Sequence, residues 1–290
     1  MRSDDDMEIE LLAGCWTTAG DAGPSLGDER SPHDIVDRIR IAAEGGFRGF
    51  GFVAADLLRT REDMGLSALK TVLNDNGINR VEVEFLGDWW ATGADRERSD
   101  ATRAFLLGAA EELEAHHIKV GGEFQTTTID MEHMANEFGD LCAMAQAAGT
   151  RVALEFMPFT NIPNLEVGLE LINKTDHAYG GLMVDIWHVV RSGTSLASLR
   201  EIPLSRIFGV ELNDANLEPV GDLFEDTIMR RVPCGDGQLD VQGFVEAMWA
   251  TGYREHWGVE IIGEAYRHQP IEESIPYAFL TSRRQLDFLE

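Results

Sequence analysis

The segment GLMVDIWHVVRSG, residues 181–193, combines a short apolar run with two polar groups that follow it closely. Its apolar part, Leu182 to Val184, is typical of a strand that is buried on both faces of a parallel sheet. Asp185 closes this run, and His188 follows three residues later in the expected loop. Placing a carboxylate and an imidazole at the mouth of a buried strand costs free energy unless they bind something. The segment therefore predicts a buried parallel strand that ends at a binding site.

Three further strand-like runs end in an acidic residue in the same way. They are residues 151–155, 207–211 and 257–260, and their last residues are Glu155, Glu211 and Glu260. The recurrence predicts that four successive strands, the fifth to the eighth, present carboxylates at the same edge.

Strand-like and helical patterns alternate along the whole chain. Eight strand-like runs recur at intervals of roughly 25 to 40 residues: 9–13, 47–53, 78–86, 118–124, 151–156, 182–185, 207–212 and 257–262. Helical patterns follow most of them. The first helix is expected to start at Ser31-Pro32, with serine as its cap and Asp34 returning a hydrogen bond, and to end at Gly45-Gly46. Asp240 is expected to cap a helix over 241–251.

This alternation predicts an α/β protein with a single (β/α)8 TIM barrel domain over residues 1–290. The acidic start, residues 1–7, is expected to be a flexible lead-in and not a secretory signal. The alternative is an open, doubly wound sheet, but no G-x-G-x-x-G motif follows the first strand to support it.

Composition narrows the classes of function. The net charge of −27 disfavours binding to nucleic acid or to an anionic membrane surface, since both are polyanions. Lysine occurs only at positions 70, 119 and 174. Three cysteines in no metal-binding or redox spacing, and no apolar segment long enough to cross a bilayer, lead us to expect a cytoplasmic protein.

In a barrel of this kind, catalytic groups lie at the carboxyl ends of the strands. Four carboxylates gathered there, Glu155, Asp185, Glu211 and Glu260, repel one another unless protons or a cation neutralise them. A divalent cation is the economical answer, and ligation by oxygen alone favours Mg²⁺ or Mn²⁺.

The ordered motifs resemble those of the xylose isomerase-like TIM barrel superfamily of sugar phosphate isomerases and epimerases. The resemblance covers residues 8 to 289 and is most specific between 151 and 262. Its motifs correspond here to Glu155, to Asp185 with His188, to Glu211 with Asp214, to Arg231 with Gly235 and Gly237, and to Glu260. Glu211 is a departure, because the family usually has a neutral ligand there. Because of this departure, the metal expected at the site is Mn²⁺ or Mg²⁺, with Zn²⁺ and Co²⁺ as alternatives.

The resemblance implies proton transfer next to a carbonyl, through an enediolate. Glu155 and Glu260 would be the base and the acid, whereas His188 and Arg231 would hold substrate oxygens. Trp16, Trp89 or Trp90, and Phe159 would form a wall against the apolar face of a sugar. Glu123, expected at the end of the fourth strand, would be either a further group for substrate binding or a hydrogen-bonding residue at the rim.

Three functions follow as alternatives. The first is a metal-dependent isomerase or epimerase of a keto-sugar or related polyol, with a small-molecule carbohydrate as its partner. The second is a dehydratase of a cyclic keto-polyol such as an inosose or dehydroshikimate. The third is a non-catalytic barrel that binds a sugar or a partner subunit, and association of the chain with further copies of itself is left open. Abasic-site nucleases share this barrel, but the acidic charge and the lack of a histidine-rich set of motifs argue against that function.

Overall fold

Eight parallel strands form a closed barrel in the computed structural model, which describes residues 9–124 and 126–289. The lead-in expected at residues 1–7 lies outside the described residues. The strands are β1 (Leu11–Ala13), β2 (Gly49–Val53), β3 (Arg80–Leu86), β4 (His117–Gly121), β5 (Arg151–Glu155), β6 (Gly180–Asp185), β7 (Ile207–Leu212) and β8 (Trp257–Val259). Each strand pairs with its neighbours in sequence, and β8 closes on β1. The predicted (β/α)8 barrel is confirmed.

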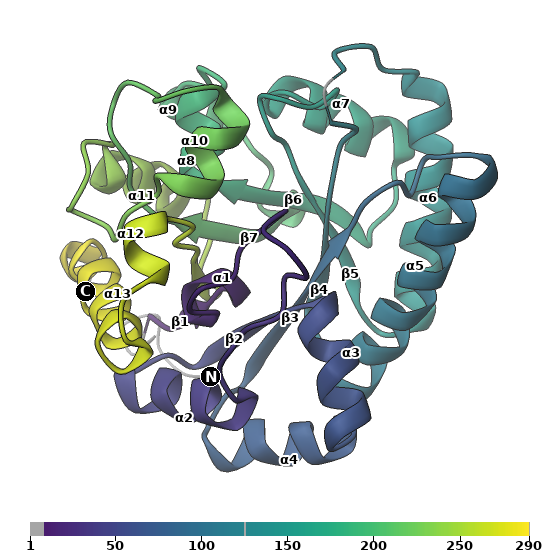
Figure 1. Ribbon diagram of the computed structural model, residues 1–290. Coiled ribbons are helices and arrows are strands. Elements are labelled where there is room, and N and C mark those ends of the chain that lie inside the picture. Colours follow the sequence, from purple (N-terminus) through teal and green to yellow (C-terminus); the bar gives the residue numbers. More distant parts are fainter. Residues whose placement is uncertain (1–8, 125, 290) are drawn as a thin grey trace, which may run out of the picture.

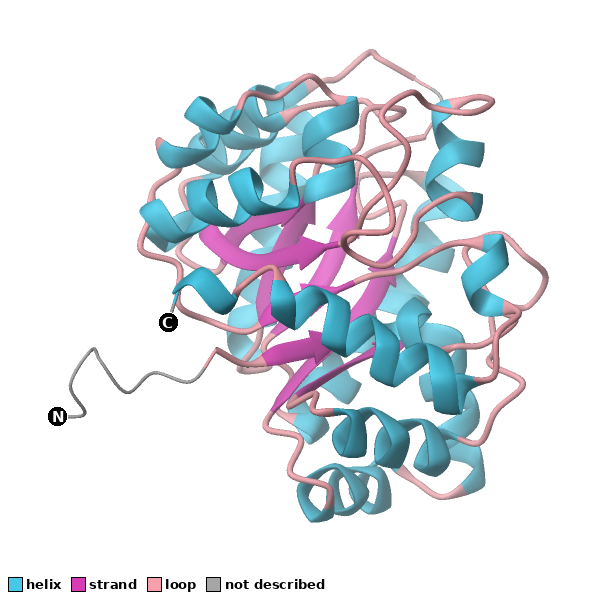
Figure 2. Ribbon diagram, turned by 90° about the vertical axis from the view of Figure 1, so that its left-hand side faces the viewer, coloured by secondary structure: helices cyan, strands magenta, loops and turns pink. Residues whose placement is uncertain are grey.

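Helices cover the outside of the barrel, as Figure 1 shows. They are α1 (Cys15–Thr18), α2 (Ile35–Gly45), α3 (Ala54–Asp63), α4 (Leu66–Asp75), α5 (Gly93–Leu113), α6 (Met131–Ala147), α7 (Leu165–Thr175), α8 (Ile186–Arg191), α9 (Leu196–Arg200), α10 (Leu223–Met229), α11 (Val241–Ala250), α12 (Glu264–Arg267) and α13 (Ile271–Arg284), with short 3-10 turns at Leu204–Arg206 and Asp287–Leu289. In Figure 2 the strands run through the middle of the molecule and the helices lie around them.

The hydrophobic core lies between the strands and the helices. Outward-facing strand residues such as Val152, Val184 and Val210 are buried against the helices, because successive side chains of a strand point to opposite faces. The inward-facing residues of β5 to β7 include Glu155, Asp185 and Glu211, which occupy the carboxyl ends of these strands. The barrel interior is therefore polar at this end.

Two helix starts test the expected caps. Asp240 caps α11 by accepting a hydrogen bond from the backbone N–H of Gly243, as predicted. The helix expected from Ser31 begins instead at Ile35, and Asp34 is its cap, accepting hydrogen bonds from Val36 and Asp37. The Ser31 hydroxyl is used elsewhere, because it donates a hydrogen bond to the carbonyl of Ala19.

No helix within the described ranges is long and apolar enough to cross a membrane.

Candidate metal and substrate site

The four predicted carboxylates come together at one end of the barrel. Glu155 ends β5, Asp185 ends β6, Glu211 lies in β7, and Glu260 follows β8 directly. One oxygen from each lies within 4.8 Å of the others, and all four side chains are buried. The convergence follows from the fold, because parallel strands of a barrel bring their carboxyl ends to one rim. Gly258 leaves room for Glu211, since a Cβ at position 258 would lie 2.8 Å from Cγ of Glu211.

Asp185 is fixed from two sides. Its Oδ1 accepts hydrogen bonds from the backbone N–H of Trp187 (2.7 Å) and His188 (3.2 Å), so that it caps α8. Its Oδ2 accepts hydrogen bonds from Asn213 Nδ2 (2.7 Å) and Arg231 Nη1 (3.0 Å). His188 thus lies in a short helix and not in the loop expected from sequence. The Asp-x-x-His spacing is the geometry of a capped helical turn.

Arg231 ties the last strands together. Its Nη1 donates hydrogen bonds to Asp185 Oδ2 and to Glu260 Oε2 (2.8 Å), while Nε and Nη2 donate to the hydroxyl of Thr227. The guanidinium also lies over the ring of Trp187, 5.5 Å from its centroid. The neighbouring Arg230 instead pairs with Glu225 at the surface. The structure therefore places Arg231, and not Arg230, in the cluster.

His188 lies between Glu155 and Arg231. Its Nε2 is 3.3 Å from Glu155 Oε1 and 3.2 Å from Arg231 Nη2. Burial lowers the pKa of His188 to about 3, against the attraction of Asp185. The imidazole is therefore neutral at neutral pH, and it can orient a hydroxyl or a carbonyl without adding charge.

Two charged residues that the sequence did not point to complete the cluster. Lys119, from β4, has its Nζ 2.6 Å from Glu211 Oε1, 2.8 Å from Glu260 Oε1 and 3.1 Å from Glu84 Oε2. Glu84 comes from β3 and accepts a hydrogen bond from the Cys15 thiol at 2.9 Å. The side chains of Lys119, Glu84 and Cys15 are all buried. The available signal was the alternation within each strand, which places Lys119 on the same face as His117, and Glu84 on the same face as Glu82.

With all its carboxylates ionised, the cluster would carry an excess of negative charge. Among the described residues, the five carboxylates Glu84, Glu155, Asp185, Glu211 and Glu260 face the two cations Lys119 and Arg231. Burial raises the pKa of Glu84 and of Glu155 to about 7 each, and it raises that of Glu211 well above its ordinary range. Glu260 is the exception: although burial opposes it, Lys119 and Arg231 hold its pKa at about 2.

Two oxygens of the cluster accept no hydrogen bond from any described residue. They are Glu155 Oε1 and Glu211 Oε2, and both are buried. A buried carboxylate oxygen without a donor needs a proton or a cation to offset the loss of water. The excess charge and these two oxygens together fit a divalent metal ion, for which Glu155, Asp185, Glu211 and Glu260 offer the donor atoms.

A cavity of about 560 Å³ opens above the carboxylates. Glu84, Glu155, His188, Arg231 and Glu260 line its polar part. Its wall is aromatic and contains the predicted Trp16, Trp90 and Phe159, together with Phe85, Phe124 and Phe224. Trp89 is placed differently, because it is buried in the core with its Nε1 donating to the carbonyl of Gly121. The volume suits a small-molecule ligand.

Glu123 is not brought to this cavity. β4 ends at Gly121, three residues earlier than the strand expected over 118–124, and the side chain of Glu123 is exposed. The chain packs closely against Asn161 after β4, since a Cβ at Gly122 would lie 2.6 Å from Asn161 Oδ1. The same oxygen accepts a hydrogen bond from the backbone N–H of Glu123. The prediction that Glu123 ends the fourth strand is wrong.

Asp214 acts on the loop that carries Arg231. Its carboxylate accepts hydrogen bonds from the backbone N–H groups of Gly235 (2.9 Å), Gly237 (3.1 Å) and Leu239 (2.9 Å). A Cβ at Gly237 would lie 2.3 Å from Asp214 Oδ1, so that only glycine allows this approach. Asp214 therefore shapes the loop and is not one of the carboxylates that converge at the cluster.

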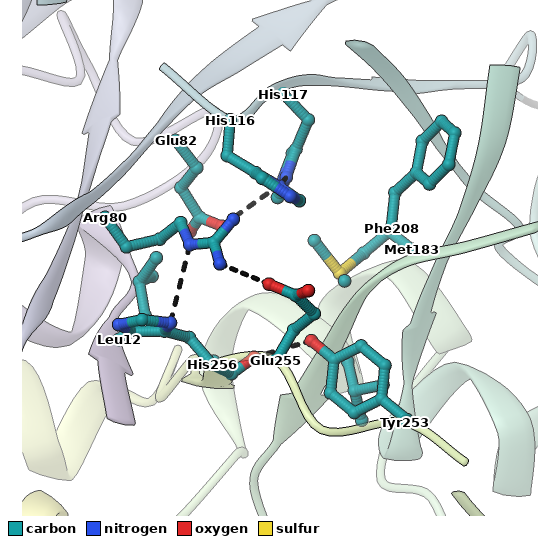
Figure 3. Close-up of a pocket in the computed structure, with 13 residues that line it drawn as sticks. Leu12, Arg80, Glu82, His116, His117, Met183, Phe208, Tyr253, Glu255 and His256 are labelled. Carbon is teal, nitrogen blue, oxygen red and sulfur yellow. Dashed lines mark hydrogen bonds and ion pairs between the residues drawn. The ribbon is translucent and has the colours of Figure 1, made fainter. Parts of the chain in front are cut away.

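A second cavity lies at the start of the strands, at the opposite end of the barrel, and is drawn in Figure 3. It is lined by Arg80, Glu82, His116, His117 and Glu255, among others, and has room for only about 20 Å³. Burial lowers the pKa of both histidines, and His117 Nε2 lies 3.2 Å from Glu82 Oε2. A space of this size holds about one water molecule and no substrate.

Comparisons with known proteins agree with this architecture. The sequence profile of the family described as "Xylose isomerase-like TIM barrel" matches residues 39–281. A 3-dehydroshikimate dehydratase of Pseudomonas putida is 23% identical over 243 residues, which cover 83% of this chain and 38% of that protein. An inosose isomerase of Bacillus subtilis is 27% identical over 145 residues, covering 49% of this chain and 51% of that protein. The matches thus span about half, or less, of the length of these relatives.

Among solved structures, the IOLI protein with a bound zinc atom superimposes with a TM-score of 0.75 at 17% identity, covering 96% of this chain and 97% of that chain. This likeness concerns the fold. The family profile matches well over half of the chain, and we conclude that the protein belongs to the xylose isomerase-like TIM barrel family.

Proposed function

We propose that the protein is a divalent-metal-dependent isomerase or epimerase that moves a proton next to the carbonyl of an uncharged keto-sugar or keto-polyol. The observation that carries this proposal is geometric: four buried carboxylates converge at one rim, and two of them, Glu155 and Glu260, line the cavity. In the metal-free protein the pKa values of these two also differ widely. Pairs of titratable groups whose environments separate their pKa values mark the acid and the base of a reaction.

We assign the roles of base and acid to Glu260 and Glu155 from their protonation states. Glu260, with a pKa of about 2, is ionised at neutral pH and is the base. In the metal-free protein Glu155 has a pKa of about 7 and exchanges its proton near neutral pH, so we assign it as the acid. General acid–base catalysis by positioned side chains contributes about 10²- to 10⁴-fold to a rate. The assignment requires that substrate binds in the cavity between them.

Glu155, Asp185, Glu211 and Glu260 would hold the metal, and Mn²⁺ or Mg²⁺ suits their oxygen atoms. When bound, such an ion polarises a carbonyl and makes the adjacent C–H more acidic. Arg231 would stabilise negative charge that develops on substrate oxygen, and neutral His188 would orient a hydroxyl. The aromatic wall of Trp16, Trp90 and Phe159 would cover the apolar face of the ring and exclude water.

The charges of the cavity favour an uncharged substrate. Glu29, Glu84 and Asp88 line it in addition to the two reacting carboxylates, whereas Arg231 is the one cationic residue among the described lining residues. Arg231 already donates to Asp185, Glu260 and Thr227. A substrate carboxylate or phosphate would therefore meet repulsion from the lining, with no side-chain cation of the described lining free to pair with it.

A dehydratase of a cyclic keto-polyol is the second candidate. The observation in its favour is the match to 3-dehydroshikimate dehydratase, which extends over 83% of this chain. The same base and acid would serve, because loss of a β-hydroxyl also begins with removal of a proton next to a carbonyl. The acidic cavity favours a neutral inosose over an acidic substrate for this reaction as well.

One experiment separates the candidates. Protein loaded with Mn²⁺ is incubated in D₂O with a panel of ketoses and inososes, and NMR follows deuterium uptake and epimer formation while ultraviolet absorption follows an enone. An epimer without an enone supports the isomerase, and an enone supports the dehydratase. Glu155→Gln and Glu260→Gln should each lose turnover, whereas Glu112→Gln, an exposed change on α5, should not. If the two site variants turn over like wild type, the carboxylates are not the acid and the base.

A further inference from the structure

Lys119 is the centre of a buried ionic network. Its side chain leaves β4 inside the barrel and is fully buried. Its Nζ lies within 3.1 Å of carboxylates from three other segments: Glu84 on β3, Glu211 on β7 and Glu260 directly after β8. Its ammonium donates hydrogen bonds to Glu211 and Glu260 and forms an ion pair with Glu84. Lys119 is not among the described residues that line the cavity of about 560 Å³.

Lys119 lies between two carboxylates that would otherwise repel each other. Glu211 and Glu260 approach each other closely, and each gives its Oε1 to the lysine. Two buried carboxylates at this separation repel strongly in a medium of low polarity. The lysine offsets this repulsion from the interior side, while Glu211 Oε2 stays without a partner among the described residues.

We propose that Lys119 is a built-in counter-cation of the carboxylate cluster. It holds Glu211 and Glu260 together before any ion binds, and its positive charge then opposes the divalent ion that shares these carboxylates. The cluster is consequently stable without metal and binds metal more weakly than the carboxylates would alone, which makes the ion exchangeable. The second statement rests on the metal site of the proposed function, whereas the first does not.

The first statement is tested on protein treated with EDTA, by thermal unfolding. Lys119→Met keeps the length of the side chain and removes its charge, so we expect a clear loss of stability. The double variant Lys119→Met/Glu260→Gln removes one charge of each sign, because Glu260 is the ionised partner of the lysine, and it should recover at least half of that loss. If the double variant is as unstable as the single one, or if neither folds, the lysine acts through packing and the proposal is overturned. If only the double variant folds, the proposal is supported.

The second statement is tested by titration calorimetry with Mn²⁺. Lys119→Met should bind Mn²⁺ at least tenfold more tightly than wild type. Lys70→Met is the matched control, because Lys70 is a partly exposed lysine paired with Glu114 at the surface, and its loss changes the net charge equally. We expect the affinity of this control to stay within twofold of wild type. If Lys119→Met binds Mn²⁺ no more tightly than wild type does, the proposal that the lysine opposes the metal is overturned.

The failure of each proposal has its own signature. If neither wild type nor Lys119→Met binds Mn²⁺, the proposed function is wrong about the metal. The comparison of thermal stability then decides the role of Lys119 by itself. If only Lys119→Met binds Mn²⁺, the counter-cation is supported and the natural protein works without that ion. If wild type binds Mn²⁺ tightly and Lys119→Met binds it more weakly, the lysine does not oppose the metal, and the metal of the proposed function is retained.

Discussion

Arg231 and Asp185 form a buried ion pair in which Nη1 of the arginine lies 3.0 Å from Oδ2 of the aspartate. The same nitrogen lies 2.8 Å from Glu260 Oε2, so that one guanidinium bridges the ends of β6 and β8. Both partners of the pair are almost completely buried. Removing one member of such a pair leaves the other charge without compensation.

Arg231→Lys should therefore lower both stability and turnover, although the substitution retains the positive charge. A lysine can replace one or two of these hydrogen bonds, but its ammonium lacks the planar fork that reaches Asp185, Glu260 and Thr227 together. We expect a loss of about 3 kcal/mol in the free energy of unfolding, measured by urea denaturation. Turnover should fall by roughly a hundredfold, because a small displacement of a positioning group has that effect.

Arg230→Lys is the matched control for this change. Arg230 is the adjacent residue, it is partly exposed, and its pairing with Glu225 is long at 3.5 Å. Surface pairs of this kind contribute little. Equal losses in the two variants would show that the loop, and not the ion pair, responds to the substitution.

The ends of β5, β6 and β7 were predictable from the sequence to within one residue, and so were the carboxylates that they carry, whereas β4 and β8 each end three residues before the expected point. β7 is found at the expected residues, and β5 ends one residue earlier than expected. The reason is that buried parallel strands are short, uniformly apolar runs, whose first polar residue marks the rim of the barrel. Glu155, Asp185 and Glu211 stand at this point, and the topology then brings them together.

Lys119 and Glu84 could not be predicted in the same way. Each alternates with apolar neighbours in its strand, which defines a face without saying whether that face points into the barrel or toward the helices. Both faces of a barrel strand are buried, so burial does not decide between them. Glu123 was misplaced for a related reason: Gly121 and Gly122 extend the apolar pattern, although the chain already turns away there.

Asp214→Asn should loosen the loop that presents Arg231. The carboxylate accepts backbone N–H groups at both oxygens, whereas the amide group of asparagine would turn a donor toward the N–H groups of Gly235 and Gly237. The loss of two buried hydrogen bonds predicts a decrease of about 2 kcal/mol in the free energy of unfolding, again measured in urea.

Turnover should decrease in this variant while the affinity for Mn²⁺ stays close to that of wild type, because Asp214 is not among the converging carboxylates. Asp222→Asn serves as the control, since Asp222 is an exposed cap of α10 and asparagine caps helices equally well. A loss of Mn²⁺ affinity in Asp214→Asn would contradict a role confined to the loop.

The stability of the metal-free protein should depend on pH through the buried glutamates. Burial raises the pKa of Glu84 and Glu155 from 4.5 to about 7. The folded state therefore holds these protons more tightly than the unfolded state, and their contribution is complete below pH 4.5 and is lost as the pH rises through 7. Glu260 acts in the opposite sense, because its pKa of about 2 gives stability that is lost as the pH falls below 4.5.

Buried histidines oppose these glutamates between about pH 5.5 and 8, because burial lowers the pKa of His116, His117 and His188 and the unfolded state then binds more protons at the lower pH. The contribution of Glu84 is therefore measured by comparison with Glu84→Gln, in which glutamine keeps the shape of the protonated acid. In EDTA, the melting temperature of wild type should fall relative to that of Glu84→Gln as the pH rises from about 5.5 to 8. The exposed change Glu112→Gln should follow wild type over the same range, and a constant difference between wild type and Glu84→Gln would refute the assignment.

Gly258→Ala tests how tightly the barrel interior is built around Glu211. The added Cβ would lie 2.8 Å from Cγ of Glu211 and 3.1 Å from the carbonyl oxygen of Val210, so that the glutamate must move. Overpacking of this kind costs about 1 to 3 kcal/mol in the free energy of unfolding, and displacement of a ligand should weaken Mn²⁺ binding severalfold. Gly108→Ala is the matched control, because position 108 lies on α5 with open space around it and alanine favours a helix. Calorimetric titration and urea denaturation of both variants decide the point: if Gly258→Ala binds Mn²⁺ as wild type does while losing stability, Glu211 is a packing residue and not a ligand.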